Sequence, residues 1–170
     1  EDITKSGVWF TDEGKVTHKV TTRVATNQHF EIPPHDRDHV VRLRLTSFAR
    51  DAQLLGVMPH MHLRGKSFRL VIHRKQATAE TLLHVPHYDF NWQHWYQLES
   101  PLALREVASL RMEARFDNSA ANPANPAPDE FVTWGDQTSE EMAVAFFDIA
   151  HSRDKQRVQE QADQHDVDEV

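Results

Sequence analysis

The sequence of 170 residues contains no cysteine. This absence excludes zinc–thiolate sites, iron–sulfur clusters and thiol nucleophiles. It does not decide the compartment, because a domain of this size can bury a core without disulfides. The sequence also lacks an apolar run long enough to span a bilayer, and residues 1–4 do not form a signal peptide. Because the first residue is not methionine, we expect a mature or excised piece of a longer protein.

Positive charge is also scarce, since 19 lysines and arginines face 26 acidic residues for a net charge of −7. That balance argues against a nucleic-acid-binding protein. Much of the acidic excess lies at the C-terminus, so the rest of the chain is only mildly acidic. Residues 151–170 are polar and have no apolar stripe, which predicts a short exposed helix or a disordered tail. We therefore expect one domain over residues 1–150 and a charged tail over residues 151–170.

Clear helix signals are almost missing, and short alternating segments take their place. Residues 39–48, 68–73 and 107–116 alternate between apolar and polar side chains, as half-buried antiparallel strands do. Runs of β-branched and aromatic residues predict further strands within 8–24 and 92–98. Asparagine and proline make 122–128 a turn-rich loop, whereas 139–142 is compatible with a helix start. The pattern predicts an all-β protein, an antiparallel, jelly-roll-like β-sandwich.

The sequence is rich in histidine, with 12 residues, and two of them form a pattern of interest. His60 and His62 are two residues apart, between Pro59 and a Gly65-Lys66 pair. In an extended segment, alternate side chains leave the same face, so the two imidazoles can converge on one metal ion. The pair on its own is compatible with zinc, non-haem iron, manganese or copper.

The third ligand distinguishes these metals. A cupin-like site needs a glutamate shortly after the second histidine, and residues 64–67 (Arg-Gly-Lys-Ser) do not supply one. A three-histidine zinc site would draw on His84, His87 or His94. A thioether would instead favour copper that cycles through Cu(I). Of the four methionines, Met142 is the unusual one, because it follows two glutamates and a Gly-Asp-Gln-Thr turn.

Three motifs in order resemble the C-terminal domain of the copper type II, ascorbate-dependent monooxygenases. This family includes peptidylglycine α-hydroxylating monooxygenase and dopamine β-monooxygenase. The segment 60–66 (His-Met-His-Leu-Arg-Gly-Lys) is similar to the family's H-x-H-x-x-G-K, and residues 32–34 match its I-P-P. Residues 139–142 (Ser-Glu-Glu-Met) are similar to its S-D-E-M. The resemblance covers residues 28–150 and is closer to bacterial members than to the animal enzymes.

The resemblance implies one copper ion held by His60, His62 and Met142. In the family this copper activates O2 for hydroxylation of a C–H bond, and a second copper in a separate N-terminal domain delivers electrons from ascorbate. It therefore implies a partner, either a missing N-terminal domain or another redox protein, and ascorbate or another donor. Acidic side chains among Glu140, Glu141, Asp136 and Asp89 are candidates for orienting the imidazoles. An extracytoplasmic, periplasmic or secreted, location is expected by analogy.

The sequence also departs from the family at two positions near the ligands. The basic residue that the peptide enzyme places two before the first histidine is Met58 here, and the aromatic hydroxyl four after the methionine is Phe146. A peptidylglycine substrate is therefore not expected. Since no N-terminal domain is present in the chain, the alternative is a non-catalytic copper-binding module for storage, delivery or sensing.

Overall fold

The computed structural model describes residues 3–153. Ten strands and two short 3-10 helices make up its secondary structure. They are η1 (Glu13–Lys15), β1 (His18–Asn27), β2 (Glu31–Ile32), β3 (His39–Leu45), β4 (Gln53–His60), β5 (Gly65–Arg74), β6 (Glu80–Val85), β7 (Tyr96–Ala103), η2 (Leu104–Glu106), β8 (Val107–Phe116), β9 (Val132–Thr133) and β10 (Ala143–Ser152).

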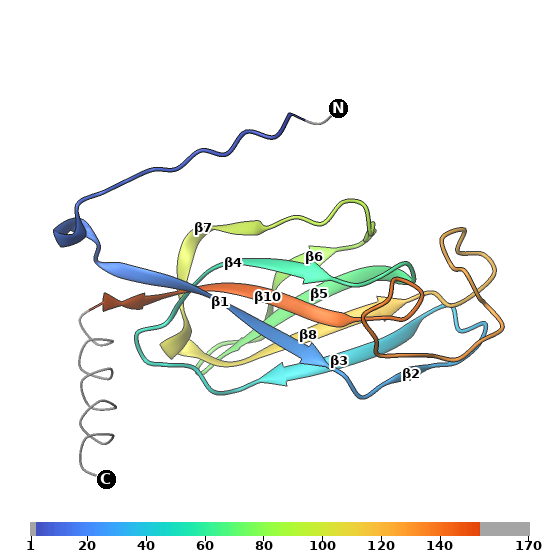
Figure 1. The fold of residues 1–170 in the computed structure, drawn as a ribbon. Coiled ribbons are helices and arrows are strands. Elements are labelled where there is room, and N and C mark those ends of the chain that lie inside the picture. The colour runs from blue at the N-terminus through green and yellow to red at the C-terminus, as the bar shows by residue number, and fades with distance from the viewer. Residues whose placement is uncertain (1–2, 154–170) are drawn as a thin grey trace, which may run out of the picture.

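Two four-stranded sheets form the layers of a sandwich (Figure 1). One has the order β1-β10-β4-β7 and the other β3-β8-β5-β6, and every strand pair within them is antiparallel. The short strands β2 and β9 pair separately. The prediction of an all-β antiparallel sandwich is confirmed. No helix among residues 3–153 is long and apolar enough to cross a membrane.

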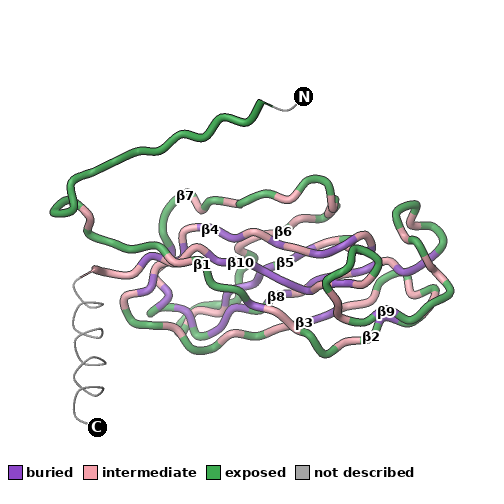
Figure 2. Tube along the Cα trace, in the orientation of Figure 1, coloured by how far each residue is buried: buried purple, intermediate pink, exposed green. Residues whose placement is uncertain are grey.

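The core lies between the sheets and follows the alternation of the sequence (Figure 2). In β8, Leu110, Met112, Ala114 and Phe116 are buried at 2% exposure or less, whereas the intervening arginines and glutamate point outward. Phe147 of β10 meets them from the facing sheet, within the same apolar cluster. Because each large side chain buried in this way contributes about 1.5–3 kcal/mol, the alternating strands determine which face of each sheet is internal.

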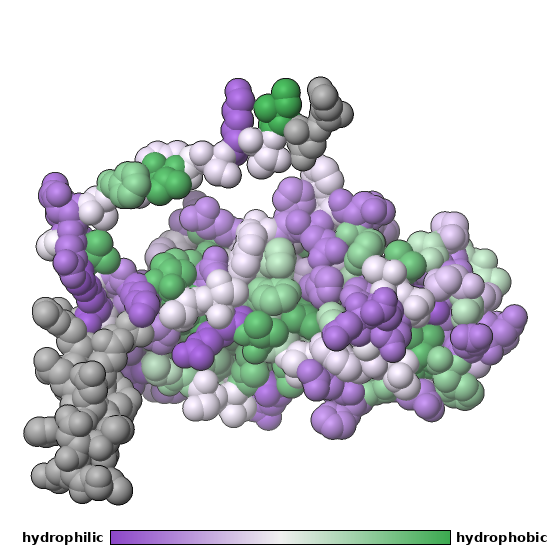
Figure 3. Space-filling view, viewed as in Figure 1, coloured by the Kyte–Doolittle hydropathy of each residue, from purple (hydrophilic) through white to green (hydrophobic). Residues whose placement is uncertain are grey.

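Four segments differ from the sequence-based expectation. Residues 8–10 form no strand, and Trp9 and Phe10 are 90% and 92% exposed. The N-terminal segment extends away from the body of the sandwich (Figures 1 and 3). The expected strand at 92–98 begins only at Tyr96, because the amide of Trp92 closes a turn with the carbonyl of Asp89. Residues 139–142 form no helix and lead directly into β10. Strand β10 reaches Ser152, two residues into the expected tail, and residues 154–170 of that tail lie outside the described residues.

The two ends of the sandwich carry different parts of the chain. The start of β1 pairs with the end of β10, His18 opposite Ser152, so the chain enters and leaves at one end. At the other end, the last residue of β4, His60, lies opposite Val144 near the start of β10. The long connection between β8 and β10 also folds over this second end (Figure 1). The predicted ligand residues therefore come together away from the termini.

Candidate metal centre

Two imidazoles meet where β4 runs into β5. His60 is the last residue of β4, and His62 follows in the turn before Gly65. Their ring centroids are 5.2 Å apart and the ring planes are nearly perpendicular, at 85°. His62 is buried at 4% exposure, and His60 is half-buried. The turn thus brings both rings to one place, as the two-residue spacing predicted.

Each ring is anchored to the protein through the same nitrogen. Nδ1 of His60 lies 2.7 Å from Oε1 of Gln93, and Nδ1 of His62 lies 3.2 Å from the backbone carbonyl oxygen of Glu140. Both partners are oxygen acceptors, so each Nδ1 carries the proton and donates it. The lone pair of each ring is then on Nε2. The two Nε2 atoms are therefore the nitrogens available to a metal ion.

Burial keeps His62 in the form that binds metals. Desolvation is the main cause that lowers the pKa of His62 below its ordinary value, and the neighbouring His60 acts in the same direction. The carbonyl of Glu140 opposes the shift but does not reverse it. A neutral imidazole at physiological pH offers a lone pair without first losing a proton.

Met142 lies beside the histidine pair at the start of β10. The β4–β10 pairing ends at His60 opposite Val144, so both chains continue from this pair toward His62 on one side and Met142 on the other. One oxygen atom supports this proximity: Oε2 of Glu141 accepts hydrogen bonds from the backbone N–H of His62 at 2.9 Å and of Met142 at 3.3 Å. Met142 is partly buried. The three predicted ligands thus belong to two segments that meet at one end of the sandwich.

The carboxylate of Glu141 joins these segments. It is fully buried, and Oε1 accepts a third backbone hydrogen bond, from the N–H of Arg64 at 2.6 Å. Burial raises the pKa of Glu141 to about 7, although the three N–H donors and the charge of Arg64 act in the opposite direction. Arg64 is itself buried, and its guanidinium binds Asn118 at 2.8 Å and the carbonyl of Ser139 at 2.7 Å. The turn after the histidines is therefore fixed by polar contacts that water does not reach.

The residue between the histidines is held inward. Met61 is fully buried, and its backbone N–H and carbonyl both bind the hydroxyl of Tyr88, at 3.0 and 2.7 Å. The ring of Tyr88 lies over Gly65, where an added Cβ would be 2.7 Å from the ring. Burial raises the pKa of Tyr88 to about 12, so the phenol remains protonated and can donate to Met61. With Met61 in the core, the two neighbouring histidines point the other way.

Aromatic side chains border the two imidazoles. The ring of Phe146 lies 6.3 Å from that of His60, and the ring of Phe90 lies 6.1 Å from that of His62, both in edge arrangements. Phe146 also lies opposite Met58 in the β4–β10 pairing. The immediate border of the pair is therefore apolar on two sides.

The other candidate ligands do not join the pair. Among the described residues, no group of three or more His, Cys, Asp or Glu side chains could hold a metal ion, so His84, His87 and His94 do not complete a three-histidine site. The ring of His94 instead packs on Trp92, with centroids 4.4 Å apart. Met112 is a core residue, at 2% exposure. The predicted ligands that lie near one another are therefore His60 and His62, with Met142 on the adjoining segment.

The acidic residues act differently from the sequence-based expectation. Glu140 contributes a backbone carbonyl to His62, while its carboxylate accepts the N–H of Gln137 at 2.9 Å. Glu141 binds backbone amides, and Asp89 accepts the N–H of Asn91 in a local turn. The side chain that orients His60 is the amide of Gln93, which sequence reasoning missed because 33 positions separate the two residues.

The fold is an antiparallel β-sandwich with a close histidine pair at one end. A family model, "Copper type II ascorbate-dependent monooxygenase, C-terminal domain", matches residues 19–168, and the chain belongs to this family. This family is copper-dependent, as its description states.

Solved structures add only a distant likeness. A chain in the crystal structure of the infectious bursal disease virus VP2 subviral particle is similar at 9% identity, with a TM-score of 0.40. The alignment covers 79% of this chain and 33% of the viral one. A comparison with curated proteins gave no match.

Proposed function

We propose that Nε2 of His60, Nε2 of His62 and the sulfur of Met142 hold one copper ion, and that the domain is the oxygen-activating half of a copper-dependent monooxygenase. The observation that supports this most directly is the anchoring of both Nδ1 atoms next to a thioether-bearing segment. Two neutral imidazoles and a thioether are ligands that accommodate both Cu(I) and Cu(II). Bound copper would supply one-electron chemistry and a place to activate O2 for hydroxylation of a C–H bond.

The protein groups have separate tasks in this proposal. Gln93 and the carbonyl of Glu140 hold the imidazole tautomers and ring orientations. Glu141 keeps the segments of His62 and Met142 together. Phe146 and Phe90 exclude water from the two sides that they border. A preorganised pair of this kind binds metal without the cost of ordering the ligands first.

Electrons must come from outside the described site. Among the described residues, no group of three or more His, Cys, Asp or Glu side chains could hold a metal ion. We therefore propose that a separate N-terminal domain or redox partner, with ascorbate or another donor, reduces the copper. An extracytoplasmic location would fit this chemistry. A site without a second metal-binding group among the described residues also fits the rival function, a copper-binding module for storage, delivery or sensing.

An anaerobic Cu(I) titration against a chromogenic chelator tests the site. We expect one equivalent to bind tightly, His60→Ala to abolish tight binding and Met142→Ala to weaken Cu(I) more than Cu(II), because the thioether prefers the reduced ion. His84→Ala is a matched control, since His84 is exposed on β6. If His60→Ala leaves the copper stoichiometry unchanged, the ligand assignment is wrong.

Oxygen uptake with ascorbate then separates the two functions. A monooxygenase half is expected to consume O2 above the rate of free copper at equal concentration, and the Met142→Ala variant is expected to lose this excess. Tight copper binding without any excess over free copper, even with reduced donor protein present, would favour storage, delivery or sensing.

A further inference from the structure

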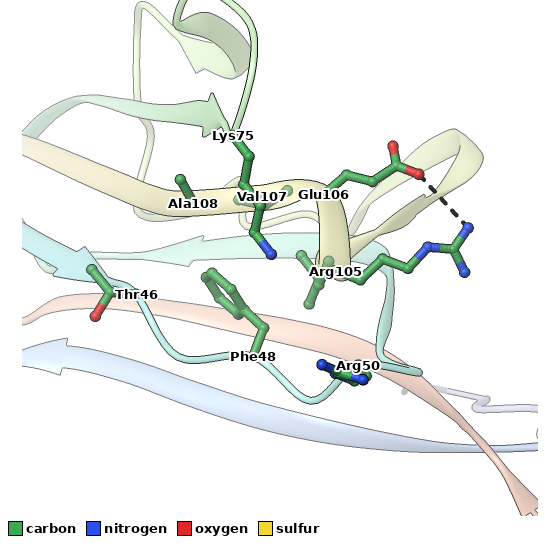
Figure 4. A pocket seen from close by; sticks show the side chains of 9 residues that line it. Thr46, Phe48, Arg50, Lys75, Arg105, Glu106, Val107 and Ala108 are labelled. Carbon is green, nitrogen blue, oxygen red and sulfur yellow. Dashed lines mark ion pairs between the residues drawn. The ribbon is translucent and has the colours of Figure 1, made fainter.

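A second feature lies at the other end of the sandwich. A cavity of about 540 Å³ opens where the connection after β3, the turn just after β5 and the segment formed by η2 and the start of β8 meet (Figure 4). Phe48 and Arg50 come from the first segment, Lys75 from the second, and Arg105 and Glu106 from the third. The length of β4, eight residues, separates this end from His60 by roughly 25 Å. The cavity is therefore independent of the candidate metal centre.

The cavity has an excess of positive charge. Three cations line it, Arg50, Lys75 and Arg105, against the single carboxylate of Glu106. That carboxylate is shared, since Arg105 lies 3.7 Å and Arg74 3.8 Å from it. Neither the guanidinium of Arg50 nor the ammonium of Lys75 has an ion-pair or hydrogen-bond partner within residues 3–153. The cavity is therefore positively charged, although the chain as a whole has a net charge of −7.

The floor of the same cavity is apolar. Leu104 and Val107, at 1% and 3% exposure, form part of the lining, and Phe48 packs against the core cluster. Figure 4 shows the Lys75 side chain extending over the cavity toward the ring of Phe48, while Arg105 and Glu106 point outward as a pair. A ligand resting on Phe48 would thus meet the Lys75 ammonium.

We propose that this cavity binds a small organic anion, whose carboxylate or phosphate group contacts Arg50 and Lys75 and whose apolar body packs on Phe48. The volume lies in the range of small-molecule sites, which combine an apolar lining with a few placed polar groups. Guanidinium and ammonium groups recognise both carboxylate and phosphate, so the two anions share this chemistry. Because the floor of the cavity is apolar, we expect it to favour an anion with an apolar body over an inorganic anion.

The test is a titration of the ¹⁵N-labelled full chain followed by NMR, with four probes: sodium benzoate, benzyl alcohol, inorganic phosphate and phenyl phosphate. We expect benzoate to shift the amides of Lys75 and residues 104–108 saturably. Benzyl alcohol, which lacks the charge, and phosphate, which lacks the apolar body, are expected to bind at least several-fold more weakly. If a phosphorylated aromatic, phenyl phosphate, binds more tightly than benzoate, the natural ligand carries phosphate; the reverse order indicates a carboxylate.

Substitutions give the second arm of the test. Lys75→Gln and Arg50→Gln are each expected to weaken benzoate roughly three- to tenfold, since both cations are exposed to solvent and screened. Arg44→Gln is the matched control, because Arg44 is an exposed arginine of β3 that does not line the cavity. Unchanged benzoate affinity in both cavity variants, or equal affinity for benzoate and benzyl alcohol, would overturn the proposal. Equal affinity for benzoate and phosphate would do so as well.

Discussion

A single hydrogen bond determines which nitrogen His60 presents to a metal ion. The acceptor is Oε1 of Gln93, 2.7 Å from Nδ1, and the amide nitrogen of Gln93 is tied in turn to the carbonyl of Phe90 at 2.8 Å. Gln93 cannot rotate its amide without losing both contacts. The loop between β6 and β7 is therefore coupled to the metal centre through one side chain.

Replacing this acceptor tests the coupling. Gln93→Leu keeps the volume but leaves Nδ1–H of His60 without a partner, so we expect copper affinity to fall about 10- to 100-fold. Gln93→Glu retains an acceptor and is expected to preserve the affinity. Chelator competition measures both, and urea unfolding should show that stability changes by less than about 1 kcal/mol, because the contact is only partly buried. Gln97→Leu is the control, because Gln97 is exposed on β7. Equal copper affinity in Gln93→Leu and the wild type would contradict the role of Gln93 in orienting His60.

Local pattern was enough to predict the strands but not the contacts between them. Alternation predicted the residues of β8 correctly, and the two-residue spacing of His60 and His62 predicted that their rings would lie close together. The contacts that fix the site, from Glu141 to His62 and from Tyr88 to Met61, join residues 79 and 27 positions apart. No periodicity within one segment carries such information. The exposed segment 8–10 was misread for a related reason, since strand propensity has no effect without a neighbouring strand to pair with.

The turn between β4 and β5 depends on the absence of one side chain. A Cβ at Gly65 would lie 2.7 Å from the Tyr88 ring and 2.8 Å from Cβ of Met61, which is closer than real contacts allow. Gly65→Ala is therefore expected to displace Tyr88 or the turn, with a stability loss of about 1–3 kcal/mol and weaker copper binding. Thermal unfolding and copper titration measure the two effects. Gly14→Ala is the matched control, because a Cβ there meets nothing within 4 Å; similar losses in both variants would exclude the steric explanation.

The candidate metal centre and the cavity lie at opposite ends of the sandwich, separated by the length of its strands. The candidate metal centre occupies the end where β4 and β5 are joined, and the cavity lined by Arg50 and Lys75 occupies the end near the termini. The β4–β10 ladder runs between the two ends and shifts its register between Asp148 and Ile149. Changes at the cavity are therefore expected to leave copper affinity unaltered, unless a ligand there shifts the sheets themselves.

The buried carboxyl of Glu141 should give the metal-free protein a recognisable pH dependence. Its ordinary pKa of 4.5 applies to the unfolded chain, whereas burial raises the folded value to about 7. Between these values the folded state binds the extra proton, so stability is greatest below pH 4.5 with respect to this group and falls as the pH rises through 7, by up to about 3 kcal/mol.

Glu141→Gln cannot ionise and should lack this fall. Urea unfolding of both proteins at a series of pH values from 5 to 8 measures the difference in slope, with Glu99→Gln as an exposed control. Parallel stability curves for wild type and Glu141→Gln would mean that the three backbone amides and Arg64 hold the carboxylate ionised throughout this range.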